Sequence, residues 1–251
     1  MGKQNQCNGG KEGDIETGHT PAAAALYPNM AENPSFRWAF IRKVYSIILI
    51  QLLLTVAVAS AFIFVRPISV FLFAGTPVSW AVLILIIIAP LITMFPMFYF
   101  QERHPINVFL LGLFTIFMAC SIGLACATKS GKVVLEAAVL TIAVVVAITL
   151  YTFWAAKRGY DFNFLGPFLT AAILILLIYW AIQIFFPLGK IGQTIYGFLG
   201  SIIFSGFILY DTDNLIKRYT YDQYISAAIA LYLDIINLFT SILSIFSGMD
   251  S

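Results

Sequence analysis

Seven long apolar runs, separated by short polar stretches, occupy most of the chain from residue 44 onward. Each run is long enough to cross a bilayer whose hydrocarbon core is about 30 Å thick. Because lipid offers no hydrogen bonds to the backbone, segments that cross it are expected to be helices. Only 10% of the 251 residues are charged, whereas soluble proteins average about 25%. We therefore predict an all-α polytopic integral membrane protein. The predicted spans of this seven-transmembrane-helix bundle are 44–65, 78–100, 106–127, 133–155, 164–186, 194–216 and 226–248.

Residues 1–36 differ from the rest of the chain because they are polar, rich in Gly, Asn and Pro, and lack a long apolar run. Such a segment buries too little apolar surface to offset the entropy lost on ordering, so we predict a disordered N-terminal tail. The loops between the apolar runs are short, and consecutive helices are therefore expected to be antiparallel neighbours. The predicted organisation is a tail over 1–36 and one transmembrane domain over 37–251.

Basic residues are distributed unequally between the two ends of the predicted spans. Lysine and arginine favour the cytosolic side of a membrane protein. With a cytosolic N-terminus, eight basic residues near the membrane lie on the cytosolic side and four lie on the other. The eight are Arg37, Arg42, Lys43, Arg103, Lys157, Arg158, Lys217 and Arg218, and the four are Arg66, Lys129, Lys132 and Lys190. We therefore predict a cytosolic N-terminus.

Two aspartates interrupt the last two apolar runs. Asp211 lies in GFILYDTDNLI, and Asp234 lies in AIALYLDIINLF. A carboxylate at membrane depth costs several kcal/mol, about 2.5–3.5 on insertion scales, so it normally faces a partner or a water-filled path. Asn214 and Asn237 each follow an aspartate by three residues and therefore share its helix face. This spacing predicts one polar site between the two helices. The alternative is that each aspartate lies at a helix end and contacts headgroup water.

Small residues occupy the face of the last span that carries Asp234. Ala227 and Ala230 precede the aspartate on this face, and Ser241 follows it. Small and polar residues in a membrane helix usually mark the face that contacts other helices. The pattern favours a last helix that packs against its neighbours through the Asp234 face.

Arg103, in the run QERHP, begins the third span from the predicted cytosolic side. Both aspartates are predicted to lie in the cytosolic half of the membrane, and arginine can bind a carboxylate with two hydrogen bonds. Arg103 is therefore a candidate latch partner for Asp211 or Asp234. The alternative is an ordinary arginine at the level of the headgroups.

The residues at this site suit weak calcium binding better than tight binding. Calcium takes six to eight oxygen ligands. The carboxylates of Asp211 and Asp234, the carboxamides of Asn214 and Asn237, and water could hold the ion transiently. Two neighbouring carboxylates also titrate as one unit, and a proton shared between them would compete with calcium. From the residues we expect a pH-sensing pair and no tightly bound cofactor. The net charge of +2 and the lack of a basic stripe argue against a nucleic-acid partner.

Three segments resemble the Bax-inhibitor/lifeguard family of transmembrane proteins, and the long polar tail resembles its lifeguard branch. They are ERHPINVFLLGLFT in the third span, ILYDTDNLI in the sixth and ALYLDIINLF in the seventh. The resemblance implies a seven-helix bundle with a central helix, and a pH-sensitive calcium leak that suppresses programmed cell death. It places the family's aspartate pair on Asp211 and Asp234 and its arginine partner on Arg103. It also implies an endoplasmic reticulum or other endomembrane location, and possible partners among membrane proteins of cell-death pathways.

Three other functions are compatible with two intramembrane aspartates. A proton-coupled transporter could use them to carry protons, and a non-conducting regulator that acts through protein partners could use them only for structure. An intramembrane aspartyl protease also has two such aspartates, and the pair Tyr210–Asp211 fits it. Around Asp234, however, Leu233 and Ile235 favour an unbroken helix without room for an extended substrate. We therefore expect no enzymatic activity.

Overall fold

The computed structural model describes residues 25–28, 30–101, 103–186 and 189–249. The described residues form helices and loops, without strands, and include seven helices long and apolar enough to cross a membrane. The helices are α1 (Pro34–Phe64), α2 (Arg66–Leu72), α3 (Pro77–Phe100), α4 (Ile106–Ala127), α5 (Gly131–Lys157), α6 (Leu165–Phe185), α7 (Gly189–Lys217) and α8 (Tyr224–Met249), with a short 3-10 turn η1 (Tyr221–Gln223) before α8. The predicted all-α fold with seven spans is confirmed.

The first helix begins ten residues before the apolar run that revealed it. Asn33 caps α1 by accepting a hydrogen bond from the backbone N–H of Ser35, and Pro34 occupies the first turn, where its missing N–H costs nothing. Residues 34–36 of the predicted tail are therefore helical, and Leu26 is buried. Residues 1–24 and 29 lie outside the described residues, so the disorder expected for them stays a prediction.

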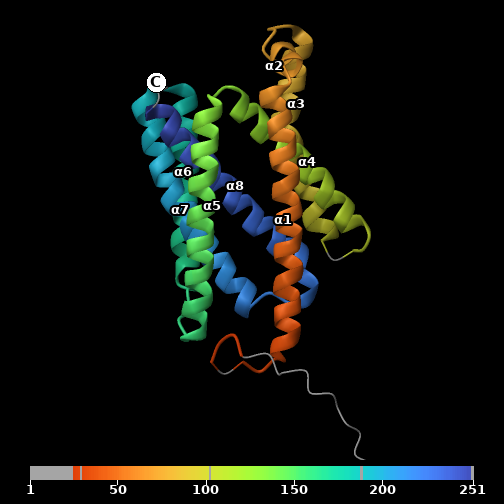
Figure 1. Ribbon diagram of the computed structural model, residues 1–251, viewed down its shortest axis with the longest axis vertical. Coiled ribbons are helices and arrows are strands. Elements are labelled where there is room, and N and C mark those ends of the chain that lie inside the picture. The colour runs from red at the N-terminus through yellow and green to blue at the C-terminus, as the bar shows by residue number, and fades with distance from the viewer. Residues whose placement is uncertain (1–24, 29, 102, 187–188, 250–251) are drawn as a thin grey trace, which may run out of the picture.

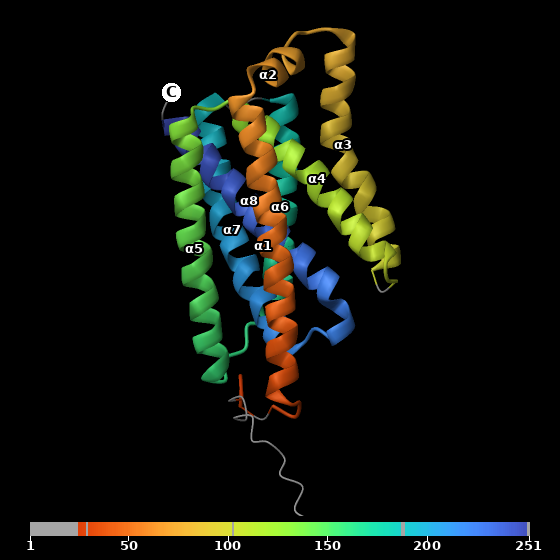
Figure 2. The same ribbon diagram turned by 45° about the vertical axis from the view of Figure 1, so that its right-hand side comes forward.

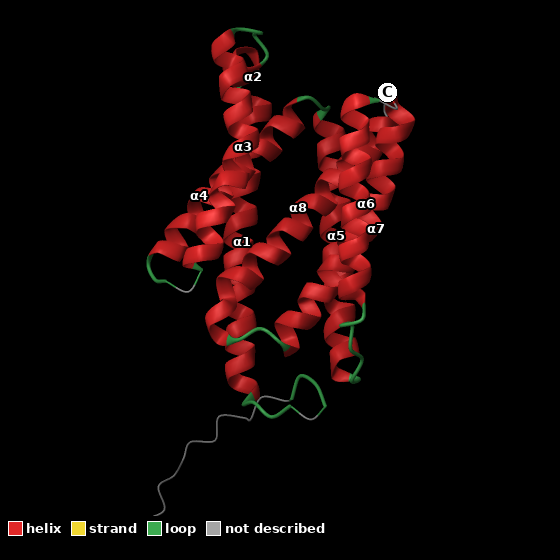
Figure 3. Ribbon diagram, turned by 180° about the vertical axis from the view of Figure 1, so that it is seen from behind, coloured by secondary structure: helices red, strands yellow, loops and turns green. Residues whose placement is uncertain are grey.

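Helix α8 is the central helix of the bundle. It crosses obliquely between one group formed by α1, α3 and α4 and another formed by α5, α6 and α7 (Figures 1 and 3). More than half of its apolar window, 56%, is buried, compared with 33% or less for the other six spans. The apolar surfaces of the outer helices face the lipid, whereas α8 contacts α1, α4, α5 and α7. Most α8 side chains are therefore surrounded by other helices.

Small residues allow α7 and α8 to approach closely. A Cβ atom added to Gly200 would lie 2.5 Å from Oγ of Ser241, and one added to Gly197 would lie 2.7 Å from the Ser241 carbonyl oxygen. Ala227 and Ser241 are buried, as the small-residue pattern of α8 predicts. This close contact, of the kind common between membrane helices, fixes the two aspartate-bearing helices against each other.

Helix α3 contains Pro90 and Pro96, and it changes direction along its length (Figure 2). Proline has no N–H, so Pro90 cannot donate to the carbonyl of Ile86 four residues earlier. Oγ of Ser121 in α4 donates to that carbonyl instead, at 2.9 Å. A neighbouring helix therefore satisfies the backbone group that the proline leaves free, which explains how α3 tolerates a proline in lipid.

We expect Ser121→Ala to lower the free energy of unfolding by about 1 kcal/mol, because it leaves the Ile86 carbonyl without a donor. The measurement is thermal unfolding of the purified protein in detergent. Ser46→Ala is the matched control, since the exposed Ser46 hydroxyl donates only to the Arg42 carbonyl of its own helix. Equal losses of stability in the two variants would show that the α3–α4 hydrogen bond contributes nothing of its own.

Candidate functional site: a cavity beside two facing aspartates

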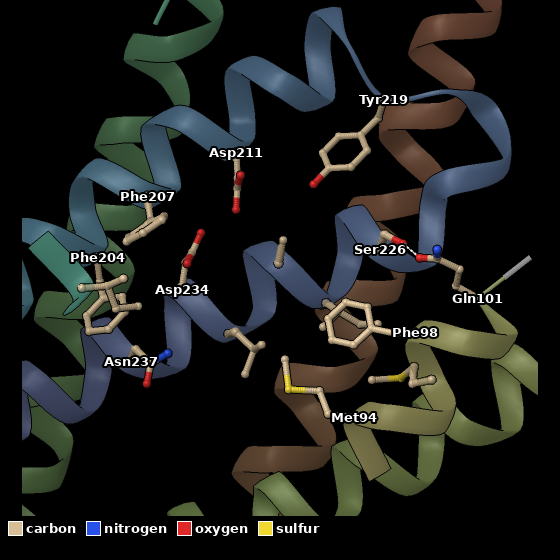
Figure 4. Close-up of a pocket in the computed structure, with 15 residues that line it drawn as sticks. Met94, Phe98, Gln101, Phe204, Phe207, Asp211, Tyr219, Ser226, Asp234 and Asn237 are labelled. Atoms are coloured by element: carbon tan, nitrogen blue, oxygen red, sulfur yellow. Dashed lines mark hydrogen bonds between the residues drawn. The ribbon is translucent and has the colours of Figure 1, made fainter. Parts of the chain in front are cut away.

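A cavity of about 350 Å³ lies beside α8, between α3, α6 and α7. Asp211 lines it from α7, and Asp234 and Asn237 line it from α8. Figure 4 shows the carboxyl groups of Asp211 and Asp234 pointing toward one another. The structure thus brings together the two residues that the sequence predicted to form one site. Their role in ion passage stays a prediction.

Asp234 is 7% exposed, and apart from the facing Asp211 carboxyl its Oδ2 atom has no hydrogen-bond partner among the described residues. Asp211 is partly buried opposite it. An unsatisfied carboxylate oxygen in a low-dielectric environment is costly, so this atom is available for a proton, a cation or water. The placement of Asp234 inside the bundle agrees with the predicted site and not with contact to headgroup water at a helix end.

Polar side chains line the end of the cavity nearest the α7–α8 connection. Oγ of Ser226 in α8 donates to Oε1 of Gln101, which directly follows α3, at 2.5 Å (Figure 4). Tyr219 lines the same end and directs its hydroxyl toward Asp211. Sequence reasoning did not identify these three residues. The spacing of Ser226 and Asp234, eight residues apart on one helix face, was a usable signal for Ser226.

The two predicted asparagines occupy different environments. Asn237 lines the cavity below Asp234. Asn214 is not among the lining residues, but its side chain hydrogen-bonds Asp211, and its Oδ1 atom also accepts a hydrogen bond from Arg218 at 2.7 Å. The shared i, i+3 face therefore places Asn237 in the cavity and brings Asn214 to Asp211 from outside the cavity lining. A supporting role for Asn214 stays a prediction.

Arg103 is exposed, and its guanidinium lies 5.8 Å from the centroid of the Phe100 ring. Within the described part of the chain, none of the ion pairs joins Arg103 to Asp211 or Asp234. The predicted latch is not formed in this conformation, and it stays a prediction for another one.

Asp213, two residues after Asp211, points away from the cavity and is fully buried. Nζ of Lys217 lies 2.5 Å from one of its oxygens, and Nη1 of Arg218 lies 3.1 Å from the other. The backbone N–H of Phe162 also donates to it, at 3.3 Å. Because Phe162 belongs to the connection between α5 and α6, Asp213 ties that connection to the end of α7.

Two further bonds join the same connection to the end of α7. Arg218 pairs with Asp161, and Lys217 donates to the Tyr160 carbonyl. Slight burial of Asp161 acts to raise its pKa, but the hydrogen bond from Arg218 and the nearby positive charges prevail and lower the pKa below its usual value. Lys217 and Arg218 therefore bind Asp213 and Asp161, and neither of them neutralises the Asp211–Asp234 pair.

From the sequence, Arg37 was expected only to help set the orientation in the membrane. In the structure it is 2% exposed in the first turn of α1. It binds both carboxylate oxygens of Glu32 and donates to the Tyr219 carbonyl at 2.6 Å. The Tyr221 hydroxyl donates to Glu32 at 2.7 Å. That hydrogen bond, together with Arg37, lowers the pKa of Glu32. The contribution of this ion pair to stability is therefore present above the ordinary pKa of glutamate and is lost as the pH falls through the lowered one. Arg37 fixes the backbone of Tyr219, a cavity residue.

The described residues contain no group of three or more His, Cys, Asp or Glu side chains able to hold a metal ion. The two carboxylates and Asn237 supply fewer oxygen atoms than the six to eight that calcium prefers. A calcium ion at the pair would therefore need several water ligands. This agrees with the weak, transient binding expected from the sequence, which stays a prediction.

Comparisons with known proteins identify the family. The family described as "Inhibitor of apoptosis-promoting Bax1" matches residues 37–251, which include the aspartate pair and all seven spans except the first three residues of α1. The chain belongs to the Bax-inhibitor/lifeguard family. It is 60% identical to Protein LIFEGUARD 4 of Arabidopsis thaliana over 240 residues, which cover 96% of this chain and 97% of that protein. The family resemblance read from the three segments is thereby confirmed.

More distant members cover the chain almost as completely. Protein lifeguard 4 of Mus musculus is 31% identical over 95% of this chain and 94% of its own length. The Golgi anti-apoptotic protein of Vaccinia virus (strain Lister) is 33% identical over 93% of this chain and 92% of its own length. Members of the Bax-inhibitor/lifeguard family from a plant, an animal and a virus thus align with this multi-pass membrane protein along nearly its whole length.

Proposed function

We propose that this protein is a pH-sensitive calcium leak of an intracellular membrane and that it suppresses programmed cell death. The observation that carries the proposal is the pair of facing carboxylates, Asp211 and Asp234, beside a cavity at membrane depth. An acid at this depth has a high free-energy cost, so such residues usually have a function. A divalent cation that enters transiently would satisfy both carboxylates at once, and a shared proton would exclude it.

The arrangement of the cavity supports a closed state of such a leak. On the predicted cytosolic side, the hydrogen bond from Ser226 to Gln101 joins α8 to the end of α3. On the other side, beyond Asn237, α7 and α8 meet through Gly197 and Gly200 without space for an added methyl group. Opening would have to separate α3 from α8 at the predicted cytosolic end and loosen the α7–α8 contact.

The relatives support the cellular part of the proposal. The viral relative is named a Golgi anti-apoptotic protein, and the family description names inhibition of apoptosis-promoting Bax1. We extend the anti-apoptotic role to this chain and place it in the Golgi, the endoplasmic reticulum or another endomembrane. We further propose that the protein has no enzymatic activity and that its partners are membrane proteins of cell-death pathways.

Calcium release from liposomes across a pH series tests the proposal. The purified protein is reconstituted into liposomes loaded with calcium, and a calcium dye outside reports the flux. We expect a flux above that of protein-free liposomes, and we expect it to fall when protons occupy the pair. Calcium-tight liposomes at every pH, with protein that still protects cells from death stimuli, would favour the non-conducting regulator.

The proposed orientation has a separate test. The structure places the α5–α6 and α6–α7 connections at opposite ends of the bundle (Figure 1). We expect an epitope tag inserted in 157–163 to be reached by antibody after selective permeabilisation of the plasma membrane, and a tag in 187–193 to stay protected. The reverse pattern would place the N-terminus and the Ser226–Gln101 end of the cavity on the side of the lumen.

The predicted latch gives a further expectation. If Arg103 pairs with one of the two aspartates in another conformation, Arg103→Ala should change the basal calcium flux or its pH response several-fold, because a bidentate partner of a carboxylate is lost. Arg42→Ala is the control, since Arg42 is another exposed basic residue on the same predicted side. Wild-type flux in Arg103→Ala at every pH would leave Arg103 with a topological role only.

A further inference from the structure

The walls of the cavity are unlike those of a path made only for ions. The α3 side presents Met94, Met97 and Phe98, the α6 side presents Ile173, and α8 adds Leu233. Hydrated ions are stabilised by oxygen atoms along their path, whereas these side chains offer hydrocarbon and sulfur. A volume of about 350 Å³ lies within the range of small-molecule sites, which are mostly apolar with a few well-placed polar groups.

The charged groups in this cavity are both acidic and lack a cation from the protein. Apart from the facing Asp211 carboxyl, the buried Oδ2 of Asp234 has no hydrogen-bond partner among the described residues. The basic residues at the end of α7, Lys217 and Arg218, are engaged by Asp213 and Asp161. A primary ammonium group carries one positive charge and three N–H donors, which suits two facing carboxylates.

The open side of the cavity faces the membrane. Helix α3 packs on α2 and α4, helix α6 packs on α7, and in the part of the chain that the structure describes these two outer helices do not pack closely against each other. Phe98 lines the cavity and is also 58% exposed on the lipid-facing surface of α3. At the end toward the loops, the Ser226–Gln101 hydrogen bond joins α8 to the end of α3. A molecule in the bilayer therefore reaches the aspartates from the side, between α3 and α6.

We propose that this cavity binds single-chain amphiphilic amines from the bilayer. The ammonium group lies between Asp211 and Asp234, and the hydrocarbon chain lies against Met94, Phe98 and Ile173. A phospholipid with an amino headgroup fits less well, because its phosphate would be repelled by the two carboxylates. This site depends on the acid pair and on the apolar walls, and it does not require that the cavity conduct calcium.

Native mass spectrometry of the purified full chain with dodecylamine, in calcium-free buffer, tests the proposal. We expect one dodecylamine to bind per chain at low concentration. Dodecanol has the same chain without the charge, and butylamine has the charge without the long chain, so both should bind at least about tenfold more weakly. If dodecanol binds equally well, the binding reflects only partition of the hydrocarbon chain and not recognition of the ammonium group. If butylamine binds equally well, the amine occupies a water-accessible site and the apolar walls contribute nothing. Either result would overturn the proposal.

Variants locate the site. Asp234→Asn should weaken dodecylamine binding at least about tenfold, because one partner of a buried charge pair is lost. Ala230→Trp keeps both aspartates and fills the cavity, so it should also prevent binding. Glu136→Gln removes an exposed acid elsewhere and should bind dodecylamine as the wild type does.

If one of the two cavity variants fails to give a monodisperse protein, the other variant still tests the site. The comparison of dodecylamine with dodecanol on the wild type tests it as well. Unchanged dodecylamine binding in folded Asp234→Asn or Ala230→Trp would overturn the site. A protein that binds the amine but conducts no calcium would refute the leak alone.

Discussion

Asp234→Asn should abolish most of the pH response of calcium flux, and Asp211→Asn should do the same. The two carboxyl groups face each other beside one cavity, and Oδ2 of Asp234 has no other partner among the described residues. A proton shared by the pair requires both acids, so either substitution removes the shared site. The measurement is the pH dependence of calcium release from liposomes.

The double variant distinguishes a coupled pair from two separate acids. Members of one interacting unit are not additive, so Asp211→Asn with Asp234→Asn should differ little from either single variant. Glu136→Gln removes an acid of α5 that is exposed beside Lys132, and it should retain the wild-type pH response. Independent, additive effects of the two single variants on the pH midpoint would contradict the pair. A pH response in Glu136→Gln as weak as that in Asp234→Asn would also contradict the pair.

Asp213→Ala should cause the largest loss of stability among the acidic residues. Asp213 is fully buried, and it contacts Lys217, Arg218 and the backbone N–H of Phe162. Lys217 is itself only 12% exposed, so removal of the acid leaves a nearly buried cation without its partner. Breaking a buried ion pair from one side typically costs about 3–5 kcal/mol.

Thermal unfolding in detergent measures this loss, with Glu136→Ala as the matched control. The Lys132–Glu136 pair is also an i, i+4 pair, but its atoms are 3.8 Å apart and its side chains are largely exposed. Such a surface pair contributes about 0–1 kcal/mol. The double variant Asp213→Ala with Lys217→Ala should recover part of the loss, because it removes the unpaired cation as well. A stability of Asp213→Ala close to that of Glu136→Ala would mean that the buried cluster does not anchor the α5–α6 connection.

The fold was largely predictable because lipid restricts the backbone to helices in segments of this length. Apolar length gave the seven spans, and the small residues of the last span indicated the face through which α8 packs against its neighbours. The central position of α8 was expected only from the family resemblance. Boundaries were less predictable. The start of α1 at Pro34 depends on the cap from Asn33 and on contacts of its polar first turns, neither of which changes the hydropathy of the run.

The candidate site was predictable in part. Local helix periodicity placed Asp234 and Asn237 on one face, and the cost of acids in lipid indicated that Asp211 and Asp234 share a site. The same periodicity placed Asn214 beside Asp211, to which its side chain is hydrogen-bonded, but it did not indicate the further hydrogen bond from Arg218 at the end of the helix. Arg103 shares a predicted depth with the aspartates, but depth does not fix its direction around the bundle, and it lies exposed beside Phe100.

By itself the sequence determined that the chain is a membrane-embedded helical bundle of the Bax-inhibitor/lifeguard family with two acids at depth, since these depend on composition, spacing and motifs within single helices. Only the tertiary structure decided that Asp213 is buried against Lys217, Arg218 and the Phe162 backbone, and that Arg103 stays apart from the aspartate pair. Asp211 and Asp213 are two residues apart, yet one faces Asp234 and the other is buried among Lys217, Arg218 and Phe162. The physical reason is that a helix turns about 100° per residue, so neighbouring acids point to different helices. Which helix stands on each side is set by contacts between segments far apart in the chain.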